Sequence, residues 1–169
     1  MSIDRKLKPW EILSVGIRSE LDAVSFYTRL QERVKNVILL QKLKFLALEE
    51  DHHRKILERL FGDRFSDKAV GAPETSLMPP IAASLGEQAS VLDLFLAALK
   101  AEDTAEAFYE EASGLSEEDG SRKMLAYLSR VERSHQAMIR SEIELLEKFP
   151  DYYNVEDFHI GGDLFHVGP

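Results

Sequence analysis

One segment of the chain occurs twice. The sequence ELDAVSFY at residues 20–27 aligns with EDTAEAFY at residues 102–109, an offset of 82 residues. This duplication restricts the fold to one built from two equivalent halves, so the chain is expected to contain two copies of one structural unit. The same offset relates two further pairs of residues, Glu50 with Glu132 and His53 with His135.

The positions of the prolines predict what each unit contains. They leave two long proline-free stretches, each long enough for a pair of helices. Pro9 suits a first helical turn, Gly62 and Gly114 are expected to end the second and third helices, and SEED at residues 116–119 is a candidate capping box for the fourth. The expected helices are residues 9–34, 36–61, 87–113 and 116–149.

The segment between the helix pairs predicts how they are connected. Residues 62–86 contain two clusters of glycine and proline and are far longer than a turn between antiparallel helices requires. A linker of this length can span a bundle, which lets the third helix run parallel to the second. We therefore expect an all-α four-helix bundle over residues 1–149, made of two helix hairpins joined by a long crossover. Residues 150–169 lack helical periodicity and are expected to form a C-terminal arm.

The second helix contains the sequence EEDHH at residues 49–53, which holds two overlapping Glu-x-x-His pairs. Spacings of three and four place Glu50 and His53 on an apolar seam, whereas Glu49 and His52 lie on its flank. We therefore expect Glu50 and His53 to face the core and the other pair to be solvated. The predicted seam is Leu43, Leu46, Glu50, His53, Leu57 and Leu60.

The other three helices carry similar interruptions in their apolar seams. Each predicted core face contains at least one glutamate, and the fourth helix also contains a histidine. The seam of the first helix is Leu13, Ile17, Glu20, Val24 and Tyr27. Those of the third and fourth are Leu92, Phe95, Leu99, Glu102, Glu106 and Tyr109, and Leu125, Leu128, Glu132, His135, Ile139 and Glu142.

Four carboxylates that converge in an apolar core require a cationic partner, because an uncompensated buried charge is strongly unfavourable. A buried salt-bridge network is the alternative to a metal, but the seams of the second and third helices contain no Lys or Arg. Mixed carboxylate and imidazole ligation in a helical bundle fits two ions of iron or manganese. The predicted ligands are Glu20, Glu50 and His53 for one ion and Glu102, Glu132 and His135 for the other, with Glu50 and Glu132 as bridges.

The composition narrows the class of protein further. With 169 residues, 44% of them hydrophobic, the chain suits one soluble domain. A formal charge of −9 argues against a nucleic-acid partner, and the absence of cysteine excludes thiolate ligands and a cysteine nucleophile. No apolar run approaches the roughly 18 residues of a membrane span, and the N-terminal residues are polar. We therefore expect no membrane partner and a cytoplasmic location.

At these residues the sequence resembles the ferritin-like superfamily, most closely the rubrerythrin branch, together with bacterioferritins. The resemblance covers residues 9–149 and rests on Glu20, EEDHH, Glu102 and VERSH at residues 131–135. It implies a non-haem di-iron centre that reacts with oxygen or peroxide. Tyr27 and Tyr109 resemble the tyrosines that surround such centres, with an ordinary core aromatic as the alternative for each.

The chain also departs from these relatives. Rubrerythrins typically carry another glutamate three residues after the third-helix ligand, where this chain has Ala105. Glu106, one position later, is a candidate for that role and for proton relay, with a semi-buried or solvated acid as the alternative. The cysteine-ligated rubredoxin domain is absent, and Asp51 stands where bacterioferritins carry a haem-ligating methionine, so no haem is expected.

Three functions fit this resemblance. In the leading hypothesis a di-iron centre reduces hydrogen peroxide or oxygen with electrons from an external donor protein. The first alternative is a ferroxidase for iron storage or detoxification, and the second is a non-catalytic metal-binding or assembly protein. The resemblance also implies a homodimer or a higher homo-oligomer.

Overall fold

A computed structural model describes residues 7–70 and 89–151 of the chain. The described residues form four long helices and no strands, as the proline spacing predicts. The expected all-α four-helix bundle is therefore confirmed. The helices are α1 (Pro9–Glu32), α2 (Val37–Arg64), α4 (Val91–Leu115) and α5 (Asp119–Lys148).

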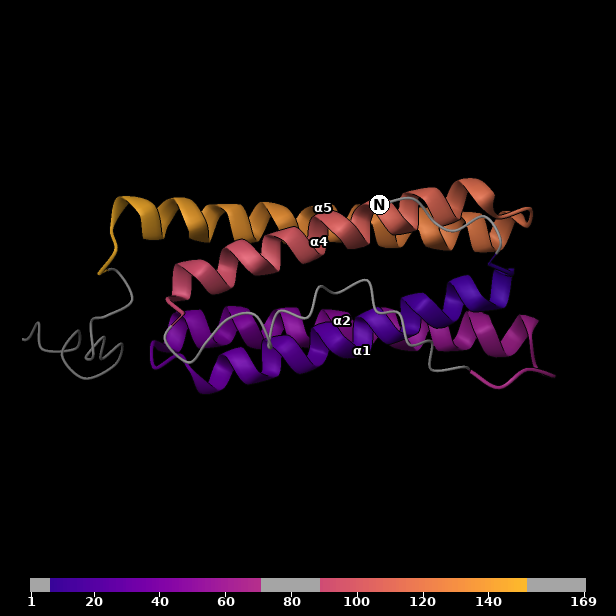
Figure 1. The fold of residues 1–169 in the computed structure, drawn as a ribbon, viewed down its shortest axis with the longest axis horizontal. Coiled ribbons are helices and arrows are strands. Elements are labelled where there is room, and N and C mark those ends of the chain that lie inside the picture. Colours follow the sequence, from indigo (N-terminus) through magenta and orange to yellow (C-terminus); the bar gives the residue numbers. More distant parts are fainter. Residues whose placement is uncertain (1–6, 71–88, 152–169) are drawn as a thin grey trace, which may run out of the picture.

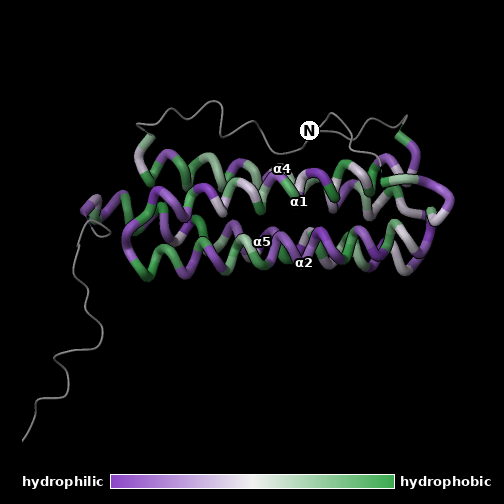
Figure 2. The backbone as a smooth tube through the Cα atoms, turned by 90° about the horizontal axis from the view of Figure 1, so that it is seen from below, coloured by the Kyte–Doolittle hydropathy of each residue, from purple (hydrophilic) through white to green (hydrophobic). Residues whose placement is uncertain are grey.

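The bundle consists of two helix hairpins laid against each other. Helices α1 and α2 pack along one another, as do α4 and α5 (Figure 1). Between the hairpins, α1 faces α4 and α2 faces α5, and these contacts are sparser (Figure 2). The cross-contacts fix the helix directions, because Tyr27 near the end of α1 reaches Glu102 in the middle of α4, whereas Tyr109 near the end of α4 reaches Glu20. Helices α1 and α4 are thus antiparallel, and α4 runs parallel to α2.

The helix ends follow local sequence signals, although several differ from the expected bounds, and α4 begins at Val91 rather than at residue 87. Asn36 caps α2 by accepting hydrogen bonds from the backbone N–H groups of Ile38 and Leu39. Gly62 and Gly114 do not end their helices, since α2 continues to Arg64 and α4 to Leu115. A helix continues through glycine at a cost of only about 1 kcal/mol, so glycine alone does not stop it.

The expected capping box at residues 116–119 is also wrong. Helix α5 begins at Asp119, and its N-cap is Glu118, whose carboxylate accepts a hydrogen bond from the backbone N–H of Ser121. Ser116 instead caps the preceding helix at its C-terminal end. The capping box lies before α4, where Ser90 and Asp93 exchange side-chain and backbone hydrogen bonds.

The core divides into two apolar clusters, one toward each end of the bundle. Leu43 and Leu46 of α2 belong to one cluster, and Leu57 and Phe61 of the same helix belong to the other. Residues 47–56 of α2 connect them and contain the buried Glu50 and His53. The fold therefore places a polar layer across the middle of the bundle, between two apolar ends.

Two expectations concern parts of the chain that lie outside the described residues. One is the crossover, most of which is residues 71–88, and the other is the C-terminal arm, most of which is residues 152–169. The domain division at residue 149 therefore stays a prediction. Among the described residues, none of the helices combines the length and apolar character that a membrane span requires.

Candidate metal centre

The six residues predicted as metal ligands come together in the polar layer. Each of them is at least 96% buried. Their potential ligand atoms form two overlapping groups, within each of which all atoms lie within 4.8 Å of one another. The first group is Glu20, Glu50, His53 and Glu132, and the second is Glu50, Glu102, Glu132 and His135.

The two histidines face each other across the hairpin interface, with their rings stacked at a centroid distance of 5.4 Å. The Nδ1 atom of His53 lies 3.0 Å from Glu50 and 3.1 Å from Glu132. The Nδ1 atom of His135 lies 3.2 Å from Glu50 and 3.4 Å from Glu132. Glu50 and Glu132 are thus shared by both halves of the cluster, the position that the sequence predicts for bridging carboxylates.

Glu20 and Glu102 complete the cluster from the other hairpin-forming helices. Their carboxylates lie 3.7 Å from His53 Nδ1 and 3.5 Å from His135 Nδ1, respectively. Each also accepts a buried hydrogen bond from a tyrosine of the opposite hairpin, Glu20 from Tyr109 and Glu102 from Tyr27. The duplicated segments therefore hold each other's glutamate through these exchanged hydrogen bonds.

Burial dominates the electrostatics of this cluster. It raises the pKa values of Glu20 and Glu102, and repulsion from neighbouring carboxylates adds to the effect. Burial and the nearby carboxylates also raise the pKa values of Tyr27 and Tyr109, which keeps both hydroxyl groups protonated as donors.

The remaining charges are set by contacts within the cluster. Burial opposes the charged form of each histidine, but the surrounding carboxylates outweigh it and raise both pKa values, that of His135 to about 12. Burial likewise opposes ionisation of Glu132, but contacts with His135 and His53 lower its pKa. Without a metal, the cluster thus balances its charge with protons.

Several buried ligand atoms nevertheless make no hydrogen bond. Among the described residues, the ion-pair contacts of the four carboxylates are with the two histidines and none is with Lys or Arg. Buried polar atoms that make no hydrogen bond are rare in folded proteins and indicate a missing partner. The atoms without a hydrogen-bond partner include Glu50 Oε1, both carboxylate oxygens of Glu132, and both ring nitrogens of His135.

Comparison with known proteins agrees with this geometry. A family model described as rubrerythrin matches residues 11–143, which include all six cluster residues. The chain belongs to the rubrerythrin family. A solved structure described as a hypothetical protein from Pyrococcus furiosus is 31% identical, with 88% of this chain and 97% of that chain covered and a TM-score of 0.77. No curated protein matches the chain.

Membership of the rubrerythrin family places the chain in the ferritin-like di-iron superfamily, and its buried Glu and His groups can hold a metal.

The structure corrects the predicted seam of α4. Glu106 lies beside the cluster rather than in it, where it accepts hydrogen bonds from Arg133 at 2.7 Å and Gln136 at 2.6 Å. These partners lower the pKa of Glu106 despite partial burial. Its expected part in proton relay stays a prediction.

In α4, Phe95, Ala98, Glu102 and Tyr109 are buried and Ala105 lines a cavity beside the carboxylates, whereas Leu99 of the predicted seam is only partly buried. The internal repeat contains the signal that identifies them, because the same offset of 82 residues relates Gly16 to Ala98 and Ala23 to Ala105. Ala23 and Ala105, together with Ser19 and Ala101, line a cavity of about 10 Å³ against the carboxylates, about the size of one water molecule. Gln136 donates a hydrogen bond to the carbonyl oxygen of Glu102. This contact was not predicted, because Gln136 is not in the predicted apolar seam of the fourth helix.

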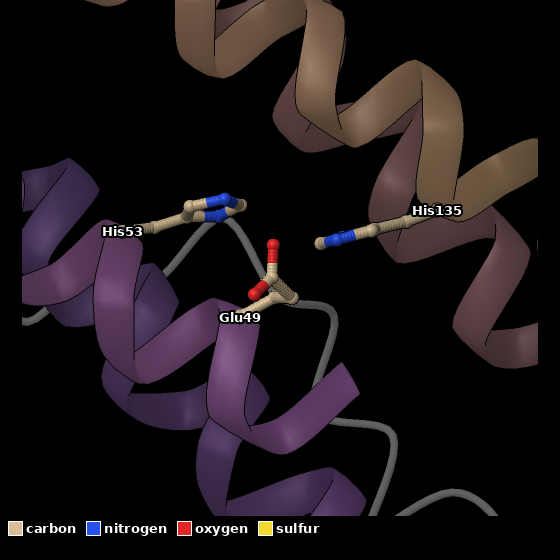
Figure 3. Close-up of side chains that lie close together, drawn as sticks. All are labelled: Glu49, His53 and His135. Carbon is tan, nitrogen blue, oxygen red and sulfur yellow. The ribbon is translucent and has the colours of Figure 1, made fainter. Parts of the chain in front are cut away.

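Of the Glu49 and His52 pair, which was expected to be solvated, one residue differs from expectation. His52 is exposed, as predicted. Glu49 is only partly exposed, and its carboxylate points toward the two imidazole rings (Figure 3). A ligand atom of Glu49 and one each of His53 and His135 lie within 4.8 Å of one another. Helix α2 therefore presents two adjacent acids, Glu49 and Glu50, to the same pair of histidines.

Proposed function

We propose that the protein is a non-haem di-iron peroxidase that reduces hydrogen peroxide with electrons from an external donor protein. The observation that carries the proposal is the overlap of two four-residue groups around shared carboxylates in a buried, apolar-flanked layer. Oxygen as an alternative oxidant and manganese as an alternative metal fit the same ligands.

The donor set fits two divalent ions. In the assignment that we propose, Glu20, Glu50 and His53 would hold one ion and Glu102, Glu132 and His135 the other, with Glu50 and Glu132 shared. Four carboxylates bring a charge of about −4, which two divalent cations neutralise without the protons that the cluster otherwise holds. The atoms of Glu50, Glu132 and His135 that make no hydrogen bond would gain a metal ion as a partner on binding.

Bound iron would supply two electrons and Lewis acidity for cleavage of the O–O bond. The protein residues would hold the ligands in position and exclude water from the site. Tyr27 and Tyr109 hold Glu102 and Glu20 in place by donating hydrogen bonds from outside the cluster. The two apolar clusters exclude water from both ends of the layer.

The reaction consumes two electrons and two protons for each hydrogen peroxide reduced to two water molecules. The proposal assigns the supply of electrons to a separate redox protein, since these 169 residues contain no cysteine and cannot form a rubredoxin-type site. The near-complete burial of the ligands favours metals that stay bound through turnover over iron that passes through as a substrate.

The first experiment is anaerobic loading with Fe(II), followed by metal counting and separate stopped-flow mixing with hydrogen peroxide and oxygen. We expect two irons per chain, faster oxidation by peroxide than by oxygen, and repeated turnover when a redox protein and its reductase are added. Glu50→Ala and His135→Ala should lose tight metal binding, whereas Glu58→Gln, on the exposed side of α2, should keep it.

Other results would contradict the proposal in distinct ways. Faster oxidation by oxygen with uptake far beyond two irons per chain would indicate a ferroxidase. Metal binding without redox turnover would indicate a binding protein. A parent protein that binds metal no more tightly than Glu50→Ala would overturn the metal centre itself.

A further inference from the structure

Glu49 stands at the boundary between solvent and the buried cluster. Its side chain is 31% exposed and that of its neighbour His52 is 64% exposed, with His52 Nδ1 and Glu49 Oε1 separated by 3.6 Å. The side chains of His53 and His135 are only 3% and 2% exposed. Potential ligand atoms thus extend from the surface inward through His52 and Glu49 to the two facing rings.

The internal repeat shows that the cluster does not need an acid at this position. The counterpart of Glu49 in the second copy is Val131, and the counterpart of His52 is Ser134. Both copies nevertheless supply the same glutamates and histidine to the cluster. Glu49 is therefore an addition to one copy, at a partly exposed position of α2.

We propose that Glu49, His53 and His135 form an outer position for a divalent transition-metal ion, through which the ion passes between solvent and the buried cluster. A carboxylate with two imidazoles is a ligand set that first-row divalent ions favour. The potential ligand atoms of these three residues lie within 4.8 Å of one another, which allows one ion to contact all three. This inference rests on the proposed metal centre.

The chemistry of imidazole makes the outer position a transit site rather than a third permanent site. A neutral imidazole ring has one nitrogen lone pair available, so it ligates one ion at a time. His53 and His135 also belong to the two inner groups. An ion held outside by these rings must therefore leave them before, or as, they ligate the inner ions, and the stoichiometry stays at two ions per chain.

A transit site predicts a kinetic effect with an unchanged equilibrium. The test uses Co²⁺ as the probe, titrated into the full-length metal-free protein, with stoichiometry and affinity from calorimetry. Stopped-flow absorbance then gives the rate of uptake, and mixing of the loaded protein with a chelator gives the rate of release. Glu49→Val copies the residue of the second repeat, and Glu49→Gln removes the charge while keeping the shape.

For both Glu49 variants we expect two tightly bound Co²⁺ per chain, as in the parent, with uptake and release each slowed about tenfold or more. Glu58→Gln is the matched control, because Glu58 lies on the same helix and pairs with Arg54 at 2.5 Å instead of with the histidines. It removes one negative charge from α2 and should change the rates by less than about threefold, because a single exposed charge has a weak, salt-screened effect.

The possible failures separate this inference from the metal centre. If the parent binds two Co²⁺ and both Glu49 variants exchange them at the parent rates, the transit site is wrong and the metal centre stands. If the Glu49 variants bind fewer than two ions, Glu49 is a permanent ligand and the transit site is also wrong. If the parent binds no Co²⁺ tightly, both proposals fall.

Discussion

Tyr27 and Tyr109 show how single residues stabilise the polar layer. Both rings are fully buried, so they serve as core aromatics, and both hydroxyl groups donate to a buried carboxylate. Leaving a buried hydrogen-bond acceptor without its donor costs about 1–3 kcal/mol. Replacing Tyr by Phe keeps the buried ring and removes only the donor. The two roles proposed for these tyrosines can therefore be separated by removing the hydroxyl alone.

We expect Tyr27→Phe and Tyr109→Phe each to lower the free energy of unfolding of the metal-free protein by about 1–3 kcal/mol, measured by urea denaturation. Tyr127→Phe is the control, because that residue is 46% exposed and should change the value by less than about 0.5 kcal/mol. Equal effects at all three positions would show that Tyr27 and Tyr109 act only as aromatic packing groups.

At the scale of the element, the glycines in the helices differ in what surrounds them. A Cβ atom added at Gly62 or Gly114 would meet nothing within 4 Å. A Cβ atom added at Gly16 would lie 3.1 Å from Leu57 Cδ1 and 3.4 Å from Tyr109 Cε1. Gly62 and Gly114 could be replaced by a residue of higher helix propensity without a clash. Gly16 instead allows α1 to approach α2 and α4.

Gly62→Ala and Gly114→Ala are therefore expected to raise the free energy of unfolding by about 0.5–1 kcal/mol each, seen as an increase of about 1–4 °C in Tm. Gly16→Ala should gain less than either, because its methyl group must displace Leu57. If either glycine ended its helix in a left-handed conformation, alanine there would destabilise the protein instead.

The N-terminus of α5 provides a pH-dependent test. Hydrogen bonds from Ser121 lower the pKa of Glu118, which also pairs with Arg64 at the end of α2. A carboxyl whose pKa is lowered by folding stabilises the protein above its unfolded pKa of about 4.3, and this contribution is lost as the pH falls through the folded pKa. Glu118 thus stabilises the helix at neutral pH and not in acid.

We expect Glu118→Ala to lower Tm by about 2–4 °C at pH 7, with the difference from the parent shrinking as the pH falls below about 4. Thermal unfolding followed by circular dichroism across this pH range is the measurement. Glu117→Ala, which removes an exposed acid from the same turn, is the matched control. A Glu118→Ala difference that stays constant into acid would mean that the carboxylate charge has no part in capping.

At the scale of the whole molecule, the proposed ions would link the two hairpins. Each ligand group contains residues of both, because Glu132 of α5 joins the first group and Glu50 of α2 joins the second. Direct contacts between the hairpins are sparser than those within them. Metal binding should therefore contribute to holding the hairpins together as well as to chemistry.

Removal of metal by a chelator is accordingly expected to lower Tm, and anaerobic addition of Fe(II) at about 100 times its Kd should restore about 2.7 kcal/mol for each independent site. Differential scanning calorimetry of both forms measures the shift. Glu132→Ala should abolish it, whereas Glu106→Gln should keep it, because Glu106 pairs with Arg133 and Gln136 outside the cluster. A shift that survives in Glu132→Ala would place the stabilising metal elsewhere.

The sequence by itself determined the four helices, the duplication and the six buried Glu and His positions of the cluster. Helical spacing decides which residues share a face, and Glu50 and His53 replace apolar residues on such a face, so a local pattern was sufficient. Only the tertiary structure decided the partners of Glu106, the hydrogen bond that Tyr27 donates to Glu102, and the approach of Glu49 to the histidines. Each of these depends on the distance between helices and on side-chain direction, which the spacing of residues along one helix does not specify.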